Sequence, residues 1–119
     1  MVRKEIPRDE WREFLQAFGA RHRGWLTSVE QGRVRISDRP LAGVELRLAG
    51  GEIEAILLRF GNGMGAIQVN APRAVRVEET LRGEETGLDL EATDGLTRLS
   101  FRTTALPEQL DGLAPSERS

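Results

Sequence analysis

The first part of the chain has the hydrophobic spacing of a helix. Four apolar side chains follow one another at i, i+3, i+4 and i+7, namely Trp11, Phe14, Leu15 and Phe18. This spacing predicts an apolar stripe along a helix over about residues 7–23, packed on the rest of the fold. Gly24 can take the left-handed conformation that terminates such a helix, and Gly19 is a weak point at which it can end early. We expect Trp25, directly after the helix, to pack beneath it.

From residue 25 onward the spacing of apolar residues changes to that of strands. Segments in which apolar and polar residues alternate are 25–31, 33–38, 43–49, and the stretches around Ile67, Val75 and Asp94-Gly95. The segment 52–60 is apolar on both faces, as in a central strand covered on both sides. The pattern therefore predicts an α+β, mainly β fold. We expect an N-terminal helix packed on an antiparallel sheet of about seven or eight strands, curled into a sandwich or partly closed barrel.

Glycine-containing turns predict how neighbouring strands pair. Gly50-Gly51 and Asp94-Gly95 are both typical of two-residue hairpin loops, and the length of such a loop fixes the register. The first turn places Leu48 opposite Ile53. Together the two turns predict two exposed cross-strand charge pairs, Arg47–Glu54 and Glu91–Arg98.

Length and composition limit the class of protein. The chain has 119 residues, which fits one domain over 1–119. We expect an ordered core over about 6–112, including a short helical turn over 107–111, and a disordered tail over 113–119. Cysteine is absent, which excludes disulfides, cysteine-bound zinc and thiol catalysis. No apolar stretch approaches the ~20 residues that span a bilayer, and the start lacks the apolar centre of a signal peptide. We therefore expect a cytoplasmic protein without membrane attachment.

Short motifs are spread over nearly the whole chain. They are Ile6-Pro7-Arg8 before Trp11, His22-Arg23-Gly24-Trp25, Pro40-Leu41-Ala42-Gly43, Asp94-Gly95 before Phe101-Arg102, and Leu106-Pro107-Glu108 before Asp111-Gly112. Over residues 5–113 the set resembles a small bacterial family known only as a domain of unknown function. The resemblance implies a stand-alone bacterial domain. It implies no activity, substrate or catalytic residue.

Charges balance overall but are segregated along the chain. There are 17 basic and 19 acidic residues, a net charge of -2, which is unlike the positive excess of nucleic-acid-binding proteins. Residues 21–39 carry five arginines against two acidic residues, a net of +3. Residues 78–94 carry seven acidic residues against one arginine, a net of -6.

The basic segment contains the predicted binding residues. A hairpin turn at Gln31-Gly32 places Glu30 opposite Arg33 and leaves Arg35 without an acidic neighbour. Together with Arg39, these arginines form a face of one strand that lacks part of its counter-charge. The acidic segment of the same chain can neutralise this face. Otherwise the face attracts an acidic protein partner or a second copy, with a salt-dependent association rate.

No segment has the spacing of a metal, cofactor or catalytic site, so we expect no metal and no cofactor. His22 is the only histidine, and at a helix end it favours a capping role or packing beside Phe18. The leading hypothesis is a non-enzymatic binding, accessory or self-associating module. One alternative is a small hydrolytic or ligand-binding enzyme with a cleft near His22 and Asp111. Another is binding of an anionic polymer by the arginine-rich segment 21–39, although no aromatic residues alternate with its arginines.

Overall fold

The structure is a computed structural model that describes residues 2–61, 65–93 and 95–102. A 3-10 helix, η1 (Arg8–Glu10), leads directly into the α-helix α1 (Trp11–Arg21). The strands are β1 (Val2–Glu5), β2 (Leu26–Gln31), β3 (Val34–Ala49), β4 (Glu52–Phe60), β5 (Ala66–Asn70), β6 (Pro72–Glu79), β7 (Glu85–Ala92) and β8 (Gly95–Phe101). The helix is therefore shorter than the predicted 7–23 and begins with one 3-10 turn.

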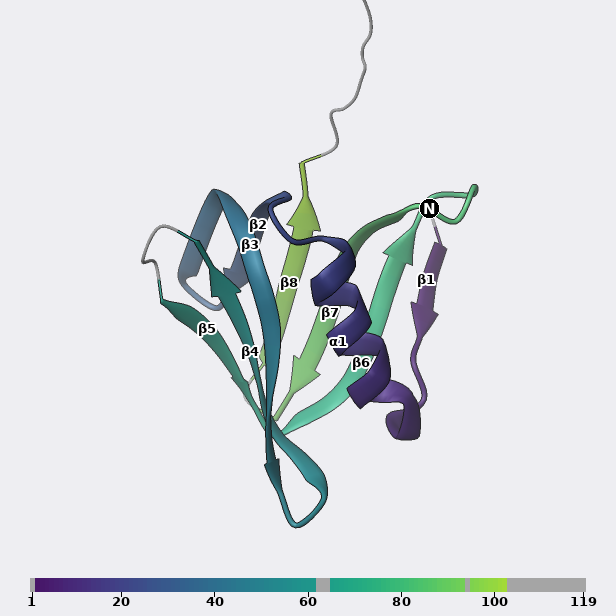
Figure 1. The fold of residues 1–119 in the computed structure, drawn as a ribbon, viewed down its shortest axis with the longest axis vertical. Coiled ribbons are helices and arrows are strands. Elements are labelled where there is room, and N and C mark those ends of the chain that lie inside the picture. The colour runs from purple at the N-terminus through teal and green to yellow at the C-terminus, as the bar shows by residue number, and fades with distance from the viewer. Residues whose placement is uncertain (1, 62–64, 94, 103–119) are drawn as a thin grey trace, which may run out of the picture.

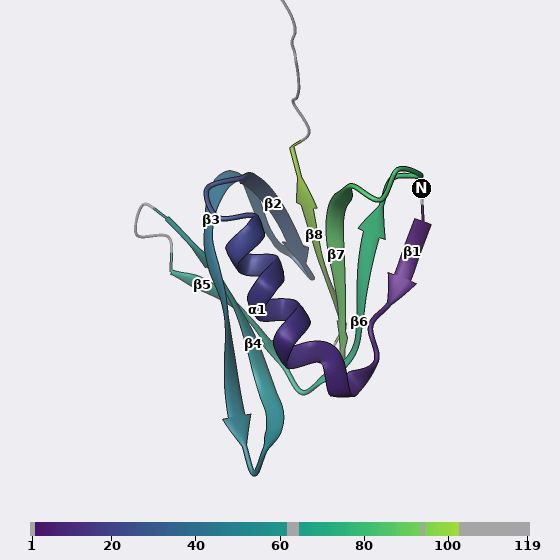
Figure 2. The same ribbon diagram turned by 45° about the vertical axis from the view of Figure 1, so that its right-hand side comes forward.

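The strands form one antiparallel sheet of eight strands in the order β1-β6-β7-β8-β2-β3-β4-β5. The sheet folds back on itself, so that β3, β4 and β5 lie opposite β6, β7 and β8, and α1 covers the opening between the two halves (Figures 1 and 2). β1 and β5 are its edges, and these two described strands do not pair to close a barrel. The predicted mainly β fold with a helix on an antiparallel sheet is confirmed.

The long strand β3 connects the two halves. Its first part pairs with β2 and its second part with β4, and the partner changes between Pro40 and Leu41. Proline fits this corner because it has no backbone N–H to donate, and in a regular part of the sheet that lack would weaken the hydrogen-bond ladder. Asp38 has a φ of 52°, and the register between β2 and β3 shifts beside it. The predicted separate strands 33–38 and 43–49 are thus one strand, because bulges rather than a loop make the bend.

Helix α1 contributes its apolar stripe to the core. Trp11, Leu15 and Phe18 are at most 2% exposed, whereas Phe14 is only half-buried. Strand β4 is covered on both faces where Ala55 and Ile56, which point in opposite directions, are both fully buried. The predictions for the helix stripe and for segment 52–60 are therefore confirmed at these positions.

Gly19 holds the helix close to the sheet. A Cβ atom on Gly19 would lie 2.8 Å from the backbone nitrogen of Val44 in β3, so only glycine permits this approach. Gly19 is buried, and α1 continues through it to Arg21. The helix does not end at this weak point, because packing against β3 outweighs the low helix propensity of glycine.

The hairpin at Gly50-Gly51 has the predicted register only near its turn. Leu48 lies opposite Ile53 as predicted, but a bulge then places Arg47 opposite Ala55. The predicted pairing of Arg47 with Glu54 is wrong. The extra residue at the bulge lets Ala55 and Ile56 continue the core of the sheet while the turn stays at the two glycines.

The last hairpin also differs from its predicted register. Ala92 lies opposite Gly95, and Arg98 lies opposite Asp89 rather than Glu91. The difference is two residues, so each strand keeps the same face toward the core while its partners change. The predicted Glu91–Arg98 pair is wrong for this reason.

Parts of the sequence predictions fall outside the described residues. They are the helical turn over 107–111, the tail over 113–119, and Asp111 with it. Among the residues that are described, no helix is long and apolar enough to cross a membrane.

Candidate functional site

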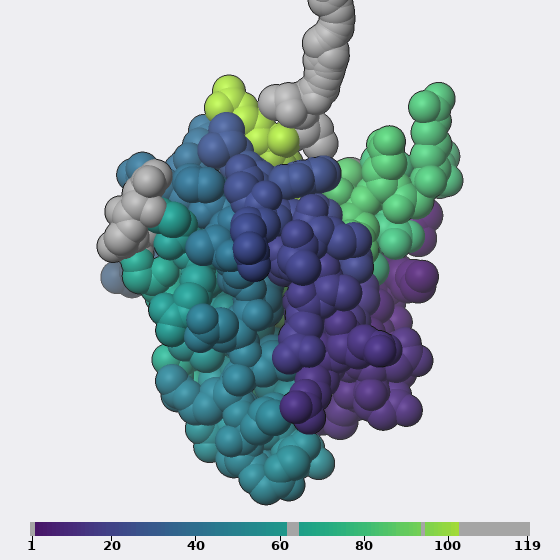
Figure 3. Space-filling model, in the orientation of Figure 1, coloured from purple at the N-terminus to yellow at the C-terminus, as the bar shows by residue number. Residues whose placement is uncertain are grey.

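A cleft of about 720 Å³ opens where α1 ends and β2 begins. One wall consists of the connection from α1 to β2, with His22, Trp25 and Leu26. The opposite wall is the turn between β6 and β7, with Thr80 and Glu84. In Figure 3 this green turn projects beside the blue end of α1.

Topology explains why distant segments meet at this cleft. Because the strands are antiparallel, β6 and β8 end at the same end of the molecule at which β2 and β7 begin, and α1 also ends there (Figure 1). Arg102, which follows β8, lines the cleft and donates its backbone N–H to the oxygen of Leu26 at 3.0 Å. The cleft is therefore built from parts of the chain that are far apart in sequence.

The connection between α1 and β2 is fixed by backbone hydrogen bonds. Gly24, with a φ of 86°, donates its N–H to the oxygen of Leu41 at 2.7 Å, and Leu41 donates to the oxygen of Trp25 at 3.0 Å. The predicted left-handed Gly24 is confirmed. These bonds hold Trp25 and Leu26 at the mouth of the cleft, where they are 46% and 38% exposed. The prediction that Trp25 packs beneath the helix is wrong, because its ring contacts His22 and Phe101 but almost half of its surface stays exposed.

His22 lies beneath this connection. Its ring stacks on Phe101 with centroids 4.3 Å apart, and its Nδ1 lies 2.8 Å from the oxygen of Phe18. Burial lowers the pKa of His22, an effect that outweighs the Phe18 carbonyl and the Glu85 carboxylate, which raise the pKa. A neutral ring can then donate its Nδ1–H to the Phe18 oxygen. The geometry is that of the capping and packing role expected for a histidine at a helix end.

The acidic side of the cleft is partly neutralised. Arg21 donates three guanidinium hydrogen bonds to Glu85, at 3.1, 3.0 and 2.8 Å, and His22 Nε2 lies 3.3 Å from the same carboxylate. Glu84 is exposed, and its carboxylate has no ion-pair partner within the described residues. Thr80 orders the turn by accepting the backbone N–H of Glu84 at 3.2 Å. The cleft thus combines an apolar wall with one free carboxylate.

The structure corrects the predicted arginine site. Glu30 lies opposite Arg35, not Arg33, and the two side chains form an ion pair at 3.1 Å. Gly32, with a φ of 57°, is the first residue of the turn rather than the second, which shifts the register. Arg35 therefore has the counter-charge that its predicted register denied it. Arg33 lies in the turn and Arg39 is exposed opposite Thr27, so the three arginines do not share one unneutralised strand face.

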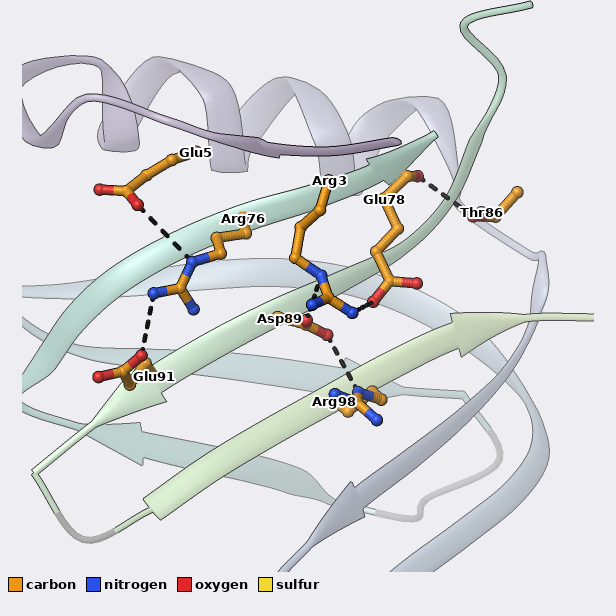
Figure 4. Close-up of polar contacts among 8 residues, drawn as sticks. All are labelled: Arg3, Glu5, Arg76, Glu78, Thr86, Asp89, Glu91 and Arg98. Atoms are coloured by element: carbon orange, nitrogen blue, oxygen red, sulfur yellow. Dashed lines mark hydrogen bonds and ion pairs between the residues drawn. The ribbon is translucent and has the colours of Figure 1, made fainter. Parts of the chain in front are cut away.

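Four carboxylates of the acidic segment, those of Glu78, Glu85, Asp89 and Glu91, pair with arginines other than Arg33, Arg35 and Arg39. The most buried of these, Asp89, has a side chain only 3% exposed and lies 3.2 Å from Arg3 and 3.3 Å from Arg98. Figure 4 shows that these contacts extend across the outer surface of β1, β6, β7 and β8.

A third arginine, Arg76, belongs to the same surface. Arg76 contacts Glu91 at 3.0 Å and Glu5 at 3.6 Å. The outer face of these strands therefore carries a network of ion pairs. This pairing favours a structural role for these charges over the attraction of a charged partner.

Asp111, the suggested partner of His22, lies outside the described residues. In the part of the chain that the structure describes, no cluster of three or more histidine, cysteine, aspartate or glutamate side chains could hold a metal ion. No family model, curated protein or solved structure matches the chain. The resemblance to a bacterial domain family stays a prediction.

Proposed function

We propose that this chain is a non-enzymatic binding module that receives an apolar segment of a partner protein in the cleft beside Trp25. The observation that carries this proposal is the exposure of Trp25 and Leu26 inside a concave site. Fully burying one large apolar side chain is worth about 1.5–3 kcal/mol. Single exposed apolar residues are common, but adjacent ones in a cleft with polar groups at its rim are typical of binding sites.

The surface around the cleft supports the same function. Leu81, on the turn between β6 and β7, is 87% exposed. Val2, opposite Glu79 at the end of β6, is 44% exposed. Both lie at the end of the molecule where the cleft opens, so a partner seated there has further apolar groups within its footprint.

The environment of His22 supports binding rather than catalysis. A general base must have a free nitrogen within reach of the proton that it takes. His22 is 3% exposed, its Nδ1 faces the Phe18 carbonyl, and its Nε2 faces Glu85, which Arg21 already holds. The cleft therefore offers a substrate little access to this ring, and the hydrolytic alternative loses its main candidate residue.

The proposal is tested by selecting displayed peptides against the immobilised full chain. We expect enrichment of peptides with two or more large apolar residues, and loss of their binding in the Leu26→Ser variant. Leu48→Ser is the matched control, since Leu48 is also an exposed strand leucine, 41% against 38%, but lies at the Gly50-Gly51 hairpin. Peptides that bind Leu26→Ser and Trp25→Ser as well as the wild type, or no enrichment at all, would contradict the proposal.

A further inference from the structure

The charged groups that line the cleft differ in sign and in availability. Among the residues that the structure describes, the acidic and basic side chains of the lining are Glu84, Glu85 and Arg102. The Glu85 carboxylate is engaged, because Arg21 donates three hydrogen bonds to it. Arg102 contacts Asp38 at 3.4 Å, whereas Glu84 has no ion-pair partner in the described part of the chain. The lining therefore carries one unpaired charge, and that charge is negative.

The turn between β6 and β7 holds the backbone of Glu84 in the cleft wall. Glu84 donates its N–H to the hydroxyl oxygen of Thr80 at 3.2 Å, and its carbonyl oxygen accepts the N–H of Thr80 at 2.9 Å. Gly83, with a φ of 87°, donates its N–H to the Thr80 carbonyl at 2.9 Å and so closes the turn. The Glu84 side chain therefore starts from a fixed point, and a ligand that contacts it orders little additional backbone.

The residues around this wall do not reverse its charge. Glu79 lies opposite Glu85 in the register of β6 and β7, is half-buried, and has no ion pair with a described residue. Arg82 belongs to the same turn, is exposed, and is not part of the cleft lining. Three carboxylates and the guanidinium groups of Arg21 and Arg82 thus surround this wall, which leaves it negative.

We infer that the partner segment received by the cleft carries a basic residue, arginine or lysine, beside its apolar residues. The basic group pairs with Glu84, and the apolar side chains cover Trp25 and Leu26. The inference rests on the proposed function, because it specifies the chemistry of the segment that the same cleft receives.

Desolvation makes this pairing selective. A partner that covers Trp25 and Leu26 also removes water from the wall opposite, where Glu84 lies. A carboxylate that loses water without gaining a counter-charge disfavours binding, so a segment with a neutral or acidic residue at this place binds more weakly. Burial of apolar surface supplies affinity for many sequences, and the carboxylate selects among them.

Arg102 gives the cleft a direction. It follows β8 and donates its backbone N–H to the oxygen of Leu26, so it belongs to the wall opposite the β6–β7 turn. A basic residue of the partner on that side meets a like charge, whereas one on the side of the turn meets Glu84. The structure therefore favours a basic residue at one end of the apolar stretch over basic residues at both ends.

The experiment selects displayed peptides in which a fixed pair of leucines is flanked by random positions, against the immobilised full chain. We expect enrichment of basic residues on one side of the leucine pair, and loss of this preference in Glu84→Gln. Glutamine keeps the size of the side chain and leaves the two backbone bonds to Thr80 in place. The matched control is Glu54→Gln in β4, since Glu54 is also exposed and has no ion pair with a described residue. This control should keep the preference.

A selected peptide is then compared with its analogue that has glutamine in place of the basic residue, by fluorescence anisotropy. On the wild type and on Glu54→Gln the analogue should bind about two- to fivefold more weakly, as expected for one exposed ion pair. The difference should shrink as salt is added. On Glu84→Gln the two peptides should bind equally.

The outcomes separate this inference from the proposed function. Leucine peptides that bind without a preference for basic residues, or a preference that persists in Glu84→Gln, would overturn the inference and leave the cleft as an apolar binding site. Peptides that bind Leu26→Ser as tightly as the wild type would overturn the proposed function, and this inference with it. The same holds if no leucine peptide binds the chain.

Discussion

His22 shows how a single residue connects α1, β7 and the cleft. Its backbone N–H and its Nδ1 both face the carbonyl of Phe18, while its ring contacts those of Phe18 and Phe101, which also contact each other. Its Nε2 approaches Glu85, which Arg21 holds with a bidentate contact. The ring thus fixes the end of the helix, and the position of Trp25 depends on it through an edge-to-face contact at 4.7 Å.

The lowered pKa of His22 predicts a loss of stability in mild acid. Burial is the main cause, and Arg21 adds to it, against the opposing effects of Phe18 and Glu85. The unfolded chain takes up the proton near the ordinary pKa of about 6.5, whereas the folded chain resists it, so protonation favours unfolding. The contribution is fully present above pH 6.5 and is lost as the pH falls through the folded pKa.

The measurement is urea unfolding between pH 7.5 and 5 for the wild type and for His22→Phe. Phenylalanine keeps the stacking on Phe101 but cannot take up a proton. As the pH falls, the free energy of unfolding of the wild type should decrease more than that of His22→Phe. Parallel pH profiles would show that His22 does not titrate differently on folding.

Gly19 gives a second test at the residue scale, because two effects predict opposite signs. In an exposed helix, glycine to alanine stabilises by about 0.5–1 kcal/mol. Here the added Cβ would lie 2.8 Å from the Val44 nitrogen, and overpacking of this kind costs about 1–3 kcal/mol. Chemical denaturation of Gly19→Ala should therefore show lower stability. The control is Ala20→Gly on the exposed side of α1, which should cost about 1 kcal/mol by propensity alone. A more stable Gly19→Ala would mean that α1 does not approach β3 so closely.

At the scale of helices and strands, the hydrophobic pattern was sufficient for element type but not for register. The apolar stripe of α1 and the alternation along the strands are local properties, and they predict the helix and most of the strands. They do not predict β1 (Val2–Glu5), and they divide β3 into two strands. Register depends on where a bulge is inserted, and a bulge is set by packing across the sheet. Arg47 and Ala55 face each other because an extra residue at Glu54 is absorbed beside the turn. Neither the glycines nor the charges at that hairpin reveal this insertion.

The charged surface of β1, β6, β7 and β8 leads to a test of non-additivity. Asp89 is buried under Arg3 and Arg98, which are themselves about half exposed, so removing one charge leaves the other. Arg3→Met and Arg98→Met keep an aliphatic side chain over Asp89, and each should lower the free energy of unfolding by about 0.2–1 kcal/mol. The double variant leaves Asp89 covered without a partner. Its loss in free energy of unfolding should exceed the sum of the two single losses and reach about 3 kcal/mol.

The control for this experiment is Asp89→Asn in the double-methionine background. A neutral amide needs no counter-charge, so this third substitution should recover stability in thermal or chemical unfolding. If the stability loss of the double variant equalled the sum of the two single losses, solvent would reach Asp89 once the guanidinium groups are gone.

At the scale of the whole molecule, the cleft could not be predicted because it has no local signature. Its walls come from the end of α1, the start of β2, the turn between β6 and β7, and the residue after β8, and only the strand order brings these together. His22 was a candidate by residue type, but Leu26 and Glu84 have nothing unusual about their sequence context. The exposure of Trp25 depends on the turn that Gly24 makes, which sequence spacing alone leaves open.

The most direct test of the binding cleft is ¹⁹F NMR of the full chain labelled with 5-fluorotryptophan. The two tryptophans give two signals: Trp25 reports on the cleft, and Trp11, 2% exposed with its Nε1–H donated to the Ile6 oxygen at 2.8 Å, is the internal control. A peptide selected on the wild-type chain should shift the Trp25 signal in proportion to saturation and leave the Trp11 signal in place. A saturating peptide that leaves the Trp25 signal unchanged would contradict the assignment of this cleft as the binding site.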